Sequence, residues 1–309
     1  MINHIPVMLD EVIENLNIIK DGIYIDCTFG CGGHSMGILK KLGKNGKLIS
    51  IDKDIESKTF SNKITDNRFI FINDNFSNIN KYLLNFNLVG KINGILLDLG
   101  LSRNQISDST RGFSFLNNGP LDMRMNKTKG LKAYDFINNE SEQVIYNVLK
   151  KFGEDKNSKK IARNIIINRN KKKILKTFDL KKIILNSSNN IKSLARCFQA
   201  IRIYINNEIK ELNCILNLVP NILCFNGILS IITFHSIEDK IVKNFFKISN
   251  EEHIFLNKIP ITNIEYINIK NKLIKMIEIN KIKPSLNEIK NNNSSRSAIL
   301  RVFKKINKF

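Results

Sequence analysis

The N-terminal third of the chain combines a glycine-rich loop with an acid that follows it. Residues 28–33 contain Gly30, Gly32 and Gly33 directly after a short apolar run, and a segment with helical spacing comes next. Glycines let the backbone approach a ligand closely because no Cβ intrudes. Asp52 lies 22 residues after Gly30, where an acid can accept hydrogen bonds from both hydroxyls of a ribose. The loop and the acid together predict a ribose-bearing cofactor.

The surroundings of the loop narrow the choice of cofactor. The third glycine of a dinucleotide-binding pattern is missing because position 35 is Ser, and the loop carries no Gly-Lys-Ser/Thr phosphate motif. Asp26 ends the strand before the glycines and suits the cationic sulfonium and amine of S-adenosylmethionine. The residues therefore favour a methyl donor. An NAD-dependent oxidoreductase is an alternative that depends on the glycine loop alone.

Further polar side chains follow two later apolar runs. Asp98 lies at the end of the run 92–99, and His235 and Ser236 follow the run 228–234. Because carboxyl ends of parallel strands meet at one sheet edge, we expect these side chains to converge. A carboxylate there could bind the cofactor, or accept a proton from a reacting amine. Asp98 is predicted as a binding residue first and a catalytic one second. His235 is a second catalytic candidate and Ser236 a substrate contact, unless Ser236 merely caps a helix.

Short apolar runs alternate with helical patterns through the first hundred residues and again near the C-terminus. This alternation is typical of an α/β fold with a doubly wound, mostly parallel sheet. The strands are expected at 23–27, 47–51, 68–72, 92–99, 228–234 and 297–304.

The pattern breaks after residue 101. Residues 102–129 show no sustained period, and three helices are expected between 140 and 186, the last one capped by Thr177. One long helix is then expected over 195–218. We therefore predict a sheet domain made of 1–106 and 197–309, opened by a helical insertion at 107–196.

Charge indicates the kind of partner. The chain has 309 residues, 49 Lys and Arg against 28 Asp and Glu, and a net charge of +21. Residues 156–182 alone hold eleven Lys or Arg and one Asp. Such a surplus favours nucleic acid over a membrane surface, although an overall drift toward Lys explains part of it.

The cellular setting is predicted from what the sequence lacks. The start has no basic and apolar signal pattern, and no run approaches the roughly 20 apolar residues of a membrane span. The five cysteines are odd in number and form no C-x-x-C pair, which favours a reducing compartment without a metal site. We expect a soluble, cytoplasmic protein with no membrane partner and no metal.

Rings and positive charges alternate in the non-periodic segment. Arg111, Phe113, Phe115 and Arg124 could stack on an unstacked base and contact phosphate, and Arg202 could approach the same substrate from a helix. The alternatives are that both Phe side chains anchor the loop in a core and that Arg202 forms a salt bridge.

Cysteine chemistry on a base is disfavoured. Methylation at carbon 5 of a pyrimidine needs a Cys nucleophile, usually after a Pro, and no Cys here follows a Pro. Cys197, Cys214 and Cys224 fall in apolar patterns, so we expect them in the core.

Seven sequence blocks resemble the ribosomal RNA small-subunit methyltransferase H family, also called MraW, nearly end to end. They are HIPVMLDE at 4–11, DCTFGCGGHS at 26–35, LLDLGLS at 96–102, RGFSFLNNGPLDMRM at 111–125, FQAIRIYINNE at 198–208, FHSIEDKIVK at 234–243 and SRSAILR at 295–301. The resemblance implies a Rossmann-like S-adenosylmethionine methyltransferase fold with an inserted helical domain. It implies methylation of the exocyclic N4 of one cytidine in the decoding region of 16S rRNA within the small subunit.

The resemblance also implies the donor-binding positions, which are Gly32, Gly33, His34, Asp52, Phe76, Asp98 and Gln105. The chain departs from the family pattern at Cys27, at Arg103-Asn104, at Asn293-Ser294 and over most of 250–290. These departures concern RNA contact more than the donor. The runner-up hypothesis is an RNA-binding ribosome-assembly factor on a methyltransferase scaffold. The sequence leaves the oligomeric state open, with a homodimer as one option.

Overall fold

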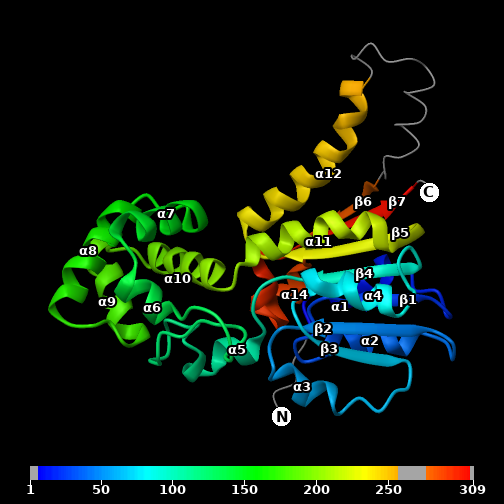
Figure 1. Cartoon of the computed structure of the whole chain (residues 1–309), viewed down its shortest axis with the longest axis horizontal. Helices are drawn as coiled ribbons and strands as arrows, with labels where there is room; N and C mark the ends of the chain where they lie inside the picture. Colours follow the sequence, from blue (N-terminus) through cyan, green and yellow to red (C-terminus); the bar gives the residue numbers. More distant parts are fainter. Residues whose placement is uncertain (1–5, 257–275, 307–309) are drawn as a thin grey trace. The chain divides into compact units, whose positions relative to one another are not determined.

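The computed structural model describes residues 6–256 and 276–306, and these form two compact units (Figure 1). The sheet unit comprises Met1–Gly100 and Glu211–Phe309, and the helical unit comprises Leu101–Lys210. The helical unit therefore extends beyond the predicted 107–196 at both ends. The reason is packing, because Leu101 and the helix residues up to Ile205 contribute to its core.

The sheet unit is built on seven strands in the order β3-β2-β1-β4-β5-β7-β6. Strands β1 to β5 pair with one another in parallel, whereas β7 is antiparallel to both β5 and β6. The doubly wound, mostly parallel sheet is thus confirmed. The strands are β1 (Ile23–Asp26), β2 (Lys47–Asp52), β3 (Phe69–Asn73), β4 (Ile92–Asp98), β5 (Leu223–Thr233), β6 (Met276–Ile282) and β7 (Ile299–Lys305).

Strand side chains alternate between two apolar layers, as a sheet covered on both faces requires. In β4, Leu96 packs toward α1 (Leu9–Asn15) and α2 (Gly33–Lys41), while its neighbours pack on the other face. That other face is covered by α4 (Ile79–Asn85), α11 (Glu208–Ile222) and α12 (Ser236–Leu256). The short elements of the unit are α3 (Ser57–Ser61), η1 (Phe76–Asn78), α14 (Leu286–Asn291) and η3 (Asn293–Ser297).

The helical unit packs its apolar helix faces around a core of its own. Its elements are α5 (Arg103–Ser107), η2 (Ser109–Arg111), α6 (Ala133–Asn139), α7 (Glu142–Gly153), α8 (Ser158–Lys171), α9 (Thr177–Ser188) and α10 (Ile191–Ile205). Thr177 is the first residue of α9 rather than its cap. Its hydroxyl instead donates to the Asn117 carbonyl and accepts from the Gly119 amide, which fixes the preceding loop.

The single helix expected over 195–218 is wrong, because the chain turns between α10 and α11. Asn207 adopts a left-handed φ of 52°, which asparagine tolerates better than most residues. The side chain of Asn206 accepts from the Met125 amide and donates to the Met123 carbonyl. Asn206, directly after α10, is thus bound to the loop that carries Met123 and Met125, which is distant in sequence.

Helices long and apolar enough to cross a membrane are absent from the described ranges. Part of the divergent 250–290 segment, namely 257–275, lies outside the described residues, as does His4 of the first motif.

Candidate functional site

The loop after β1 is held by Asp26, which is wholly buried. Its two carboxyl oxygens accept hydrogen bonds from the Thr28 amide at 3.1 Å and the Ser35 hydroxyl at 2.6 Å. Burial raises the pKa of Asp26, although the Ser35 hydrogen bond opposes this. The expectation that Asp26 faces the methyl donor is therefore corrected: its oxygens join the loop to α2.

The two glycines predicted to bind the cofactor are required for different reasons. Gly32 has a φ of +83°, a conformation that a side chain would strain. A Cβ on Gly33 would lie 2.3 Å from Cγ of Pro6. Gly33 thus allows the N-terminal segment to pack on the start of α2, while Gly32 shapes the loop itself.

Asp52 is bound directly to the glycine loop, and its predicted ribose contact stays a prediction. At the carboxyl end of β2, its Oδ2 accepts from the Gly30 amide at 2.7 Å and its Oδ1 from the Asp54 amide at 2.8 Å. Burial raises the pKa of Asp52, and these hydrogen bonds oppose that rise. A carboxylate has lone pairs beyond these two contacts, so hydroxyl groups of a ribose can still bind.

His34 and Asp98 form the most unusual polar pair of the sheet unit. His34 Nε2 lies 3.5 Å from Asp98 Oδ2, and the His34 side chain is only 6% exposed. Both ring nitrogens of His34 and Oδ1 of Asp98 are buried without a hydrogen-bond partner among the described residues. Burial lowers the pKa of His34, but Asp98 and Asp26 outweigh it and the net shift is upward.

Unpartnered buried atoms of this kind fit a polar, cationic ligand. A buried acceptor without a donor costs free energy, and a bound ligand that supplies the donor removes the cost. The loop, Asp52 and the His34–Asp98 pair all belong to the sheet unit, at the carboxyl ends of β1, β2 and β4. These residues therefore fit S-adenosylmethionine, with Asp52 for its ribose and Asp98 near its charged end.

The remaining predicted donor residues lie in two different places. Phe76 begins η1 just after β3 and packs partly on the sheet core, so it shares the carboxyl edge with Asp52. Gln105 belongs to the helical unit, where it forms a capping box with Ser102 at the start of α5. Its proposed contact with the donor stays a prediction.

His235 lies directly before α12 and contacts Glu238 in the first turn of that helix. Its Nδ1 accepts from the Glu238 amide at 3.4 Å, and its Nε2 lies 3.1 Å from Glu238 Oε1. Ser236 is the exposed first residue of the helix, so the cap position belongs to His235. The catalytic role of His235 and the substrate contact of Ser236 stay predictions, and the observed contacts of His235 are structural.

Arg111 and Phe113 lie inside the helical unit and not on its surface. Arg111 is 1% exposed, and its Nη2 donates to the carbonyls of Arg124 and Met125. Its guanidinium lies over the Phe113 ring, which is itself part of the core. Phe113 is packed as the core-anchor alternative expects, and the RNA contacts of Arg111 and Phe113 stay predictions.

The other predicted RNA contacts are also engaged within the helical unit. Phe115 packs edge-on against Phe198 with ring centroids 5.5 Å apart. Arg124 pairs with Asp122 through two hydrogen bonds of 2.8 Å, and Arg202 pairs in the same bidentate way with Glu208. These arginines hold the loop and the α10–α11 turn in place.

The cysteine prediction is partly corrected. The five cysteines, all within the described residues, form no disulfide, and Cys197 is buried in the core of the helical unit, where burial raises its pKa. Cys224 is partly buried, but Cys214 is exposed on α11 and so is not a core residue.

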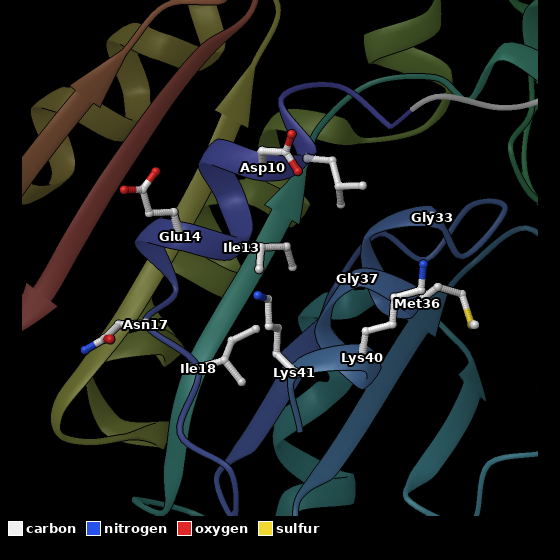
Figure 2. A pocket seen from close by; sticks show the side chains of 11 residues that line it. Asp10, Ile13, Glu14, Asn17, Ile18, Gly33, Met36, Gly37, Lys40 and Lys41 are labelled. Atoms are coloured by element: carbon white, nitrogen blue, oxygen red, sulfur yellow. The ribbon is translucent and has the colours of Figure 1, made fainter. Parts of the chain in front are cut away.

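A pocket of about 610 Å³ lies on the sheet unit between α1 and α2 (Figure 2). Gly33 is the only predicted donor residue that lines it, and the acids of the donor site do not. Its lining residues are Leu9, Asp10, Ile13, Glu14, Asn17, Ile18, Gly33, Met36, Gly37, Lys40 and Lys41.

One functional candidate escaped the sequence reasoning altogether. Glu211, in the first turn of α11, lies beside Asn75 after β3, 136 residues away along the chain. No motif marks this pair, because only the fold brings the two residues together.

Comparison with known proteins now identifies the family. The model of the MraW methylase family matches residues 1–306. Ribosomal RNA small subunit methyltransferase H from Buchnera aphidicola subsp. Baizongia pistaciae is 50% identical over 99% of this chain and 98% of that protein. The protein of the same name from Buchnera aphidicola subsp. Cinara cedri is 51% identical over 97% and 98%.

A solved structure of a putative methyltransferase from Streptococcus mutans in complex with SAH matches 98% of this chain and 99% of that one. Its identity is 13% and its TM-score 0.37, so the assignment stands on the family model and the sequence relatives. The chain belongs to the MraW methylase family.

Proposed function

We propose that this chain transfers a methyl group from S-adenosylmethionine to the exocyclic N4 of one cytidine in the decoding region of 16S rRNA. Its relatives are named as methyltransferases of small-subunit ribosomal RNA, which supports the substrate class. The observation that carries the proposal is Asp98, whose Oδ1 is buried and unpartnered at the carboxyl end of β4 beside His34.

Asp98 is suited to the difficulty of the reaction. Cytosine N4 is a weak nucleophile because its lone pair is delocalised into the ring. A carboxyl oxygen that accepts one N4 hydrogen localises the lone pair and takes up the positive charge that develops as the nitrogen gains the methyl group. The same oxygen then receives the surplus proton, and His34, 3.5 Å from the other oxygen, stabilises the orientation of the carboxyl group.

The other donor-site residues of the sheet unit hold and orient S-adenosylmethionine. S-adenosylmethionine supplies the methyl group on a sulfonium ion. Asp52 accepts hydrogen bonds from the ribose, the loop around Gly32 admits the donor closely, and Phe76 provides an apolar surface for the adenine. Positioning of this kind accounts for much of the rate in a direct displacement.

The helical unit is proposed to recognise the RNA. Its predicted arginine contacts are internally paired, but Lys159, Lys160 and Arg163 are exposed on α8, and Lys171 to Lys173 are exposed around its end. Exposed cations of this density bind phosphate without regard to sequence and attract RNA over a long range.

Methyl transfer to unmodified small ribosomal subunits tests the proposal. The purified chain is incubated with labelled S-adenosylmethionine and subunits, or with free 16S rRNA, and the product nucleoside is identified by mass spectrometry. We expect N4-methylcytidine. Another methylated nucleoside, or donor binding without any transfer, would overturn the proposal.

The variant Asp52→Ala separates this function from that of a binding-only assembly factor. Loss of the ribose contacts is expected to weaken donor affinity roughly tenfold to a hundredfold. Methylation at limiting donor should fall in parallel, while RNA affinity in a filter-binding assay stays unchanged. If the chain promotes subunit assembly equally well with and without Asp52, the assembly-factor alternative is favoured instead.

A further inference from the structure

Glu211 is a glutamate whose two carboxyl oxygens are treated differently by the protein. Oε1 accepts a hydrogen bond from the Asn75 side-chain amide at 3.4 Å. Oε2 is buried and has no hydrogen-bond partner among the described residues. A buried carboxyl oxygen without a donor costs free energy, so the arrangement calls for a hydrogen-bond donor from outside the chain.

Other acids at the same edge of the sheet show that this is unusual. Asp74 uses one oxygen for Asn75 and Asn78 and the other for Lys81 and Tyr82. Asp239 binds Arg301 with both of its oxygens. The protein satisfies these acids internally, whereas it leaves one oxygen of Glu211 open.

Glu211 lies next to the region that should receive the adenine. Asn75 and Phe76 follow β3, and α4 and α11 pack on the same face of the sheet. Strand β3 is bonded to β2, where Asn73 lies opposite Asp52 and donates to its carbonyl at 2.8 Å. Asn75, which follows β3 and donates to Glu211, is therefore one strand beyond the ribose acid.

The order of the strands sets the direction of the donor. Asp98 ends β4, the glycine loop follows β1 and Asp52 ends β2, in the spatial order β4-β1-β2-β3. A donor with its sulfonium near Asp98 and its ribose at Asp52 must extend its base toward β3. This direction leads toward Phe76 and Asn75, the hydrogen-bond partner of Glu211.

We propose that Glu211 recognises the adenine of the methyl donor by accepting a hydrogen bond from its exocyclic amino group at Oε2. Asn75 orients the carboxyl group through Oε1, and Phe76 contacts the ring. This inference depends on the proposed function for the identity of the donor. It adds a specificity residue that lies outside every recognised sequence motif of the chain.

Three ligands distinguish the two groups that could donate a hydrogen bond to Glu211 Oε2, namely the adenine amino group and the amino-acid amine. S-adenosylhomocysteine has both the adenine amino group and the amino-acid amine. S-inosylhomocysteine replaces the adenine amino group with oxygen, and methylthioadenosine lacks the amino acid. Affinities of the full chain for all three are measured by calorimetry, with the wild type and the isosteric variant Glu211→Gln.

The wild type should bind the adenine form roughly tenfold to a hundredfold more tightly than the inosine form. Glu211→Gln should reduce this preference to about threefold or less, because an amide can also donate to the inosine oxygen. Glu211→Asp keeps the charge and should retain part of the preference. Glu14→Gln, an exposed acid on α1, serves as the matched control and should leave the preference unchanged.

A purely structural role is excluded by the ratio of affinities, since misfolding weakens all three ligands alike. An unchanged preference for S-adenosylhomocysteine over S-inosylhomocysteine in Glu211→Gln would overturn the inference. So would a variant that loses only its preference for S-adenosylhomocysteine over methylthioadenosine, because Glu211 would then contact the amino-acid amine. Failure of the proposed function gives a different result from failure of this inference. The wild type would show the Glu211-dependent adenine preference but would transfer no methyl group to small subunits. Absence of any S-adenosylhomocysteine binding would overturn both.

Discussion

The two units of this protein treat their functional candidates in opposite ways. In the sheet unit, His34, Asp98 and Glu211 keep buried polar atoms without partners among the described residues. In the helical unit, Arg124 and Arg202 each form a bidentate ion pair with a neighbouring acid. The first unit leaves buried polar atoms open where a ligand should bind, whereas the second pairs Arg124 and Arg202, two of its predicted RNA contacts, with its own acids.

This difference shows that a sequence motif can specify either ligand-binding residues or residues that fix a loop. The acids and histidine of the sheet unit can bind a small, enclosed ligand because their open atoms lie at strand ends. The long block at 111–125 instead specifies a loop, with Arg111 fixing its backbone from inside. We therefore expect phosphate contacts from exposed cations outside that block.

Removal of the Asp98 carboxylate should produce the largest effect. Asp98→Asn keeps the shape but weakens the acceptor for the N4 proton, so kcat should fall roughly a hundredfold to ten-thousandfold. Single-turnover methyl transfer to small subunits measures this. Asp21→Asn, at an exposed turn, is the control. Equal activity of both variants would remove Asp98 from the chemistry and leave it as a donor contact.

Arg111 tests the helical unit, where we expect the side chain to contribute to stability and not to ligand binding. Arg111→Ala leaves two carbonyls without this donor and creates a cavity, so the helical unit should lose about 3 kcal/mol of unfolding free energy. Chemical denaturation and hydrogen exchange at 111–125 report this loss. Arg163→Ala, exposed on α8, should stay within about 0.5 kcal/mol of the wild type. Similar stability of both variants would contradict a structural role for Arg111.

The sequence predicted the sheet unit better than the helical unit for a physical reason. Buried parallel strands such as β4 are near-continuous apolar runs, and the Asp52–Gly30 contact depends on local spacing that recurs in this fold. Strand β6 was missed because it is mostly exposed, and because Glu278, Asn280 and Lys281 interrupt its apolar residues. The helix break at Asn206 depends on a loop 81 residues away, which no local pattern contains.

The exposed lysines of α8 should have a moderate effect on RNA affinity. The triple variant Lys159→Ala, Lys160→Ala, Arg163→Ala removes three exposed cations, so affinity for 16S rRNA should fall about threefold to tenfold. The dependence of log affinity on log salt should also become shallower by up to about 2.

Lys41, Lys44 and Lys47 of the sheet unit provide the matched control, since all three are also exposed. If their removal weakens RNA binding as much as the α8 variant does, the basic charge acts through the whole molecule. The proposed division of labour between the two units would then be wrong.

The smallest expected effect concerns Asp74, which the sheet unit satisfies internally. Burial would raise its pKa, but hydrogen bonds from Lys81, Asn78 and Tyr82 outweigh this and lower the pKa to about 2. A carboxyl group with a lowered pKa stabilises the fold above its ordinary pKa, and this contribution disappears as the pH falls toward 2. Asp74→Asn should therefore flatten the acid limb of the stability profile between about pH 4 and 2, by less than about 1 kcal/mol.

Asp66 makes the Asp74 experiment a comparison of two environments. Arg68 lowers the pKa of Asp66 to about 2 as well, but the Asp66 side chain is held by Arg68, whereas Asp74 is also bound by Asn78 and Tyr82. Urea unfolding of both Asn variants over that pH range should show the larger change for Asp74, whose contacts also hold the turn carrying Asn75. A larger change for Asp66→Asn would mean that surface charge, and not the satisfied turn after β3, governs the acid stability of the sheet unit.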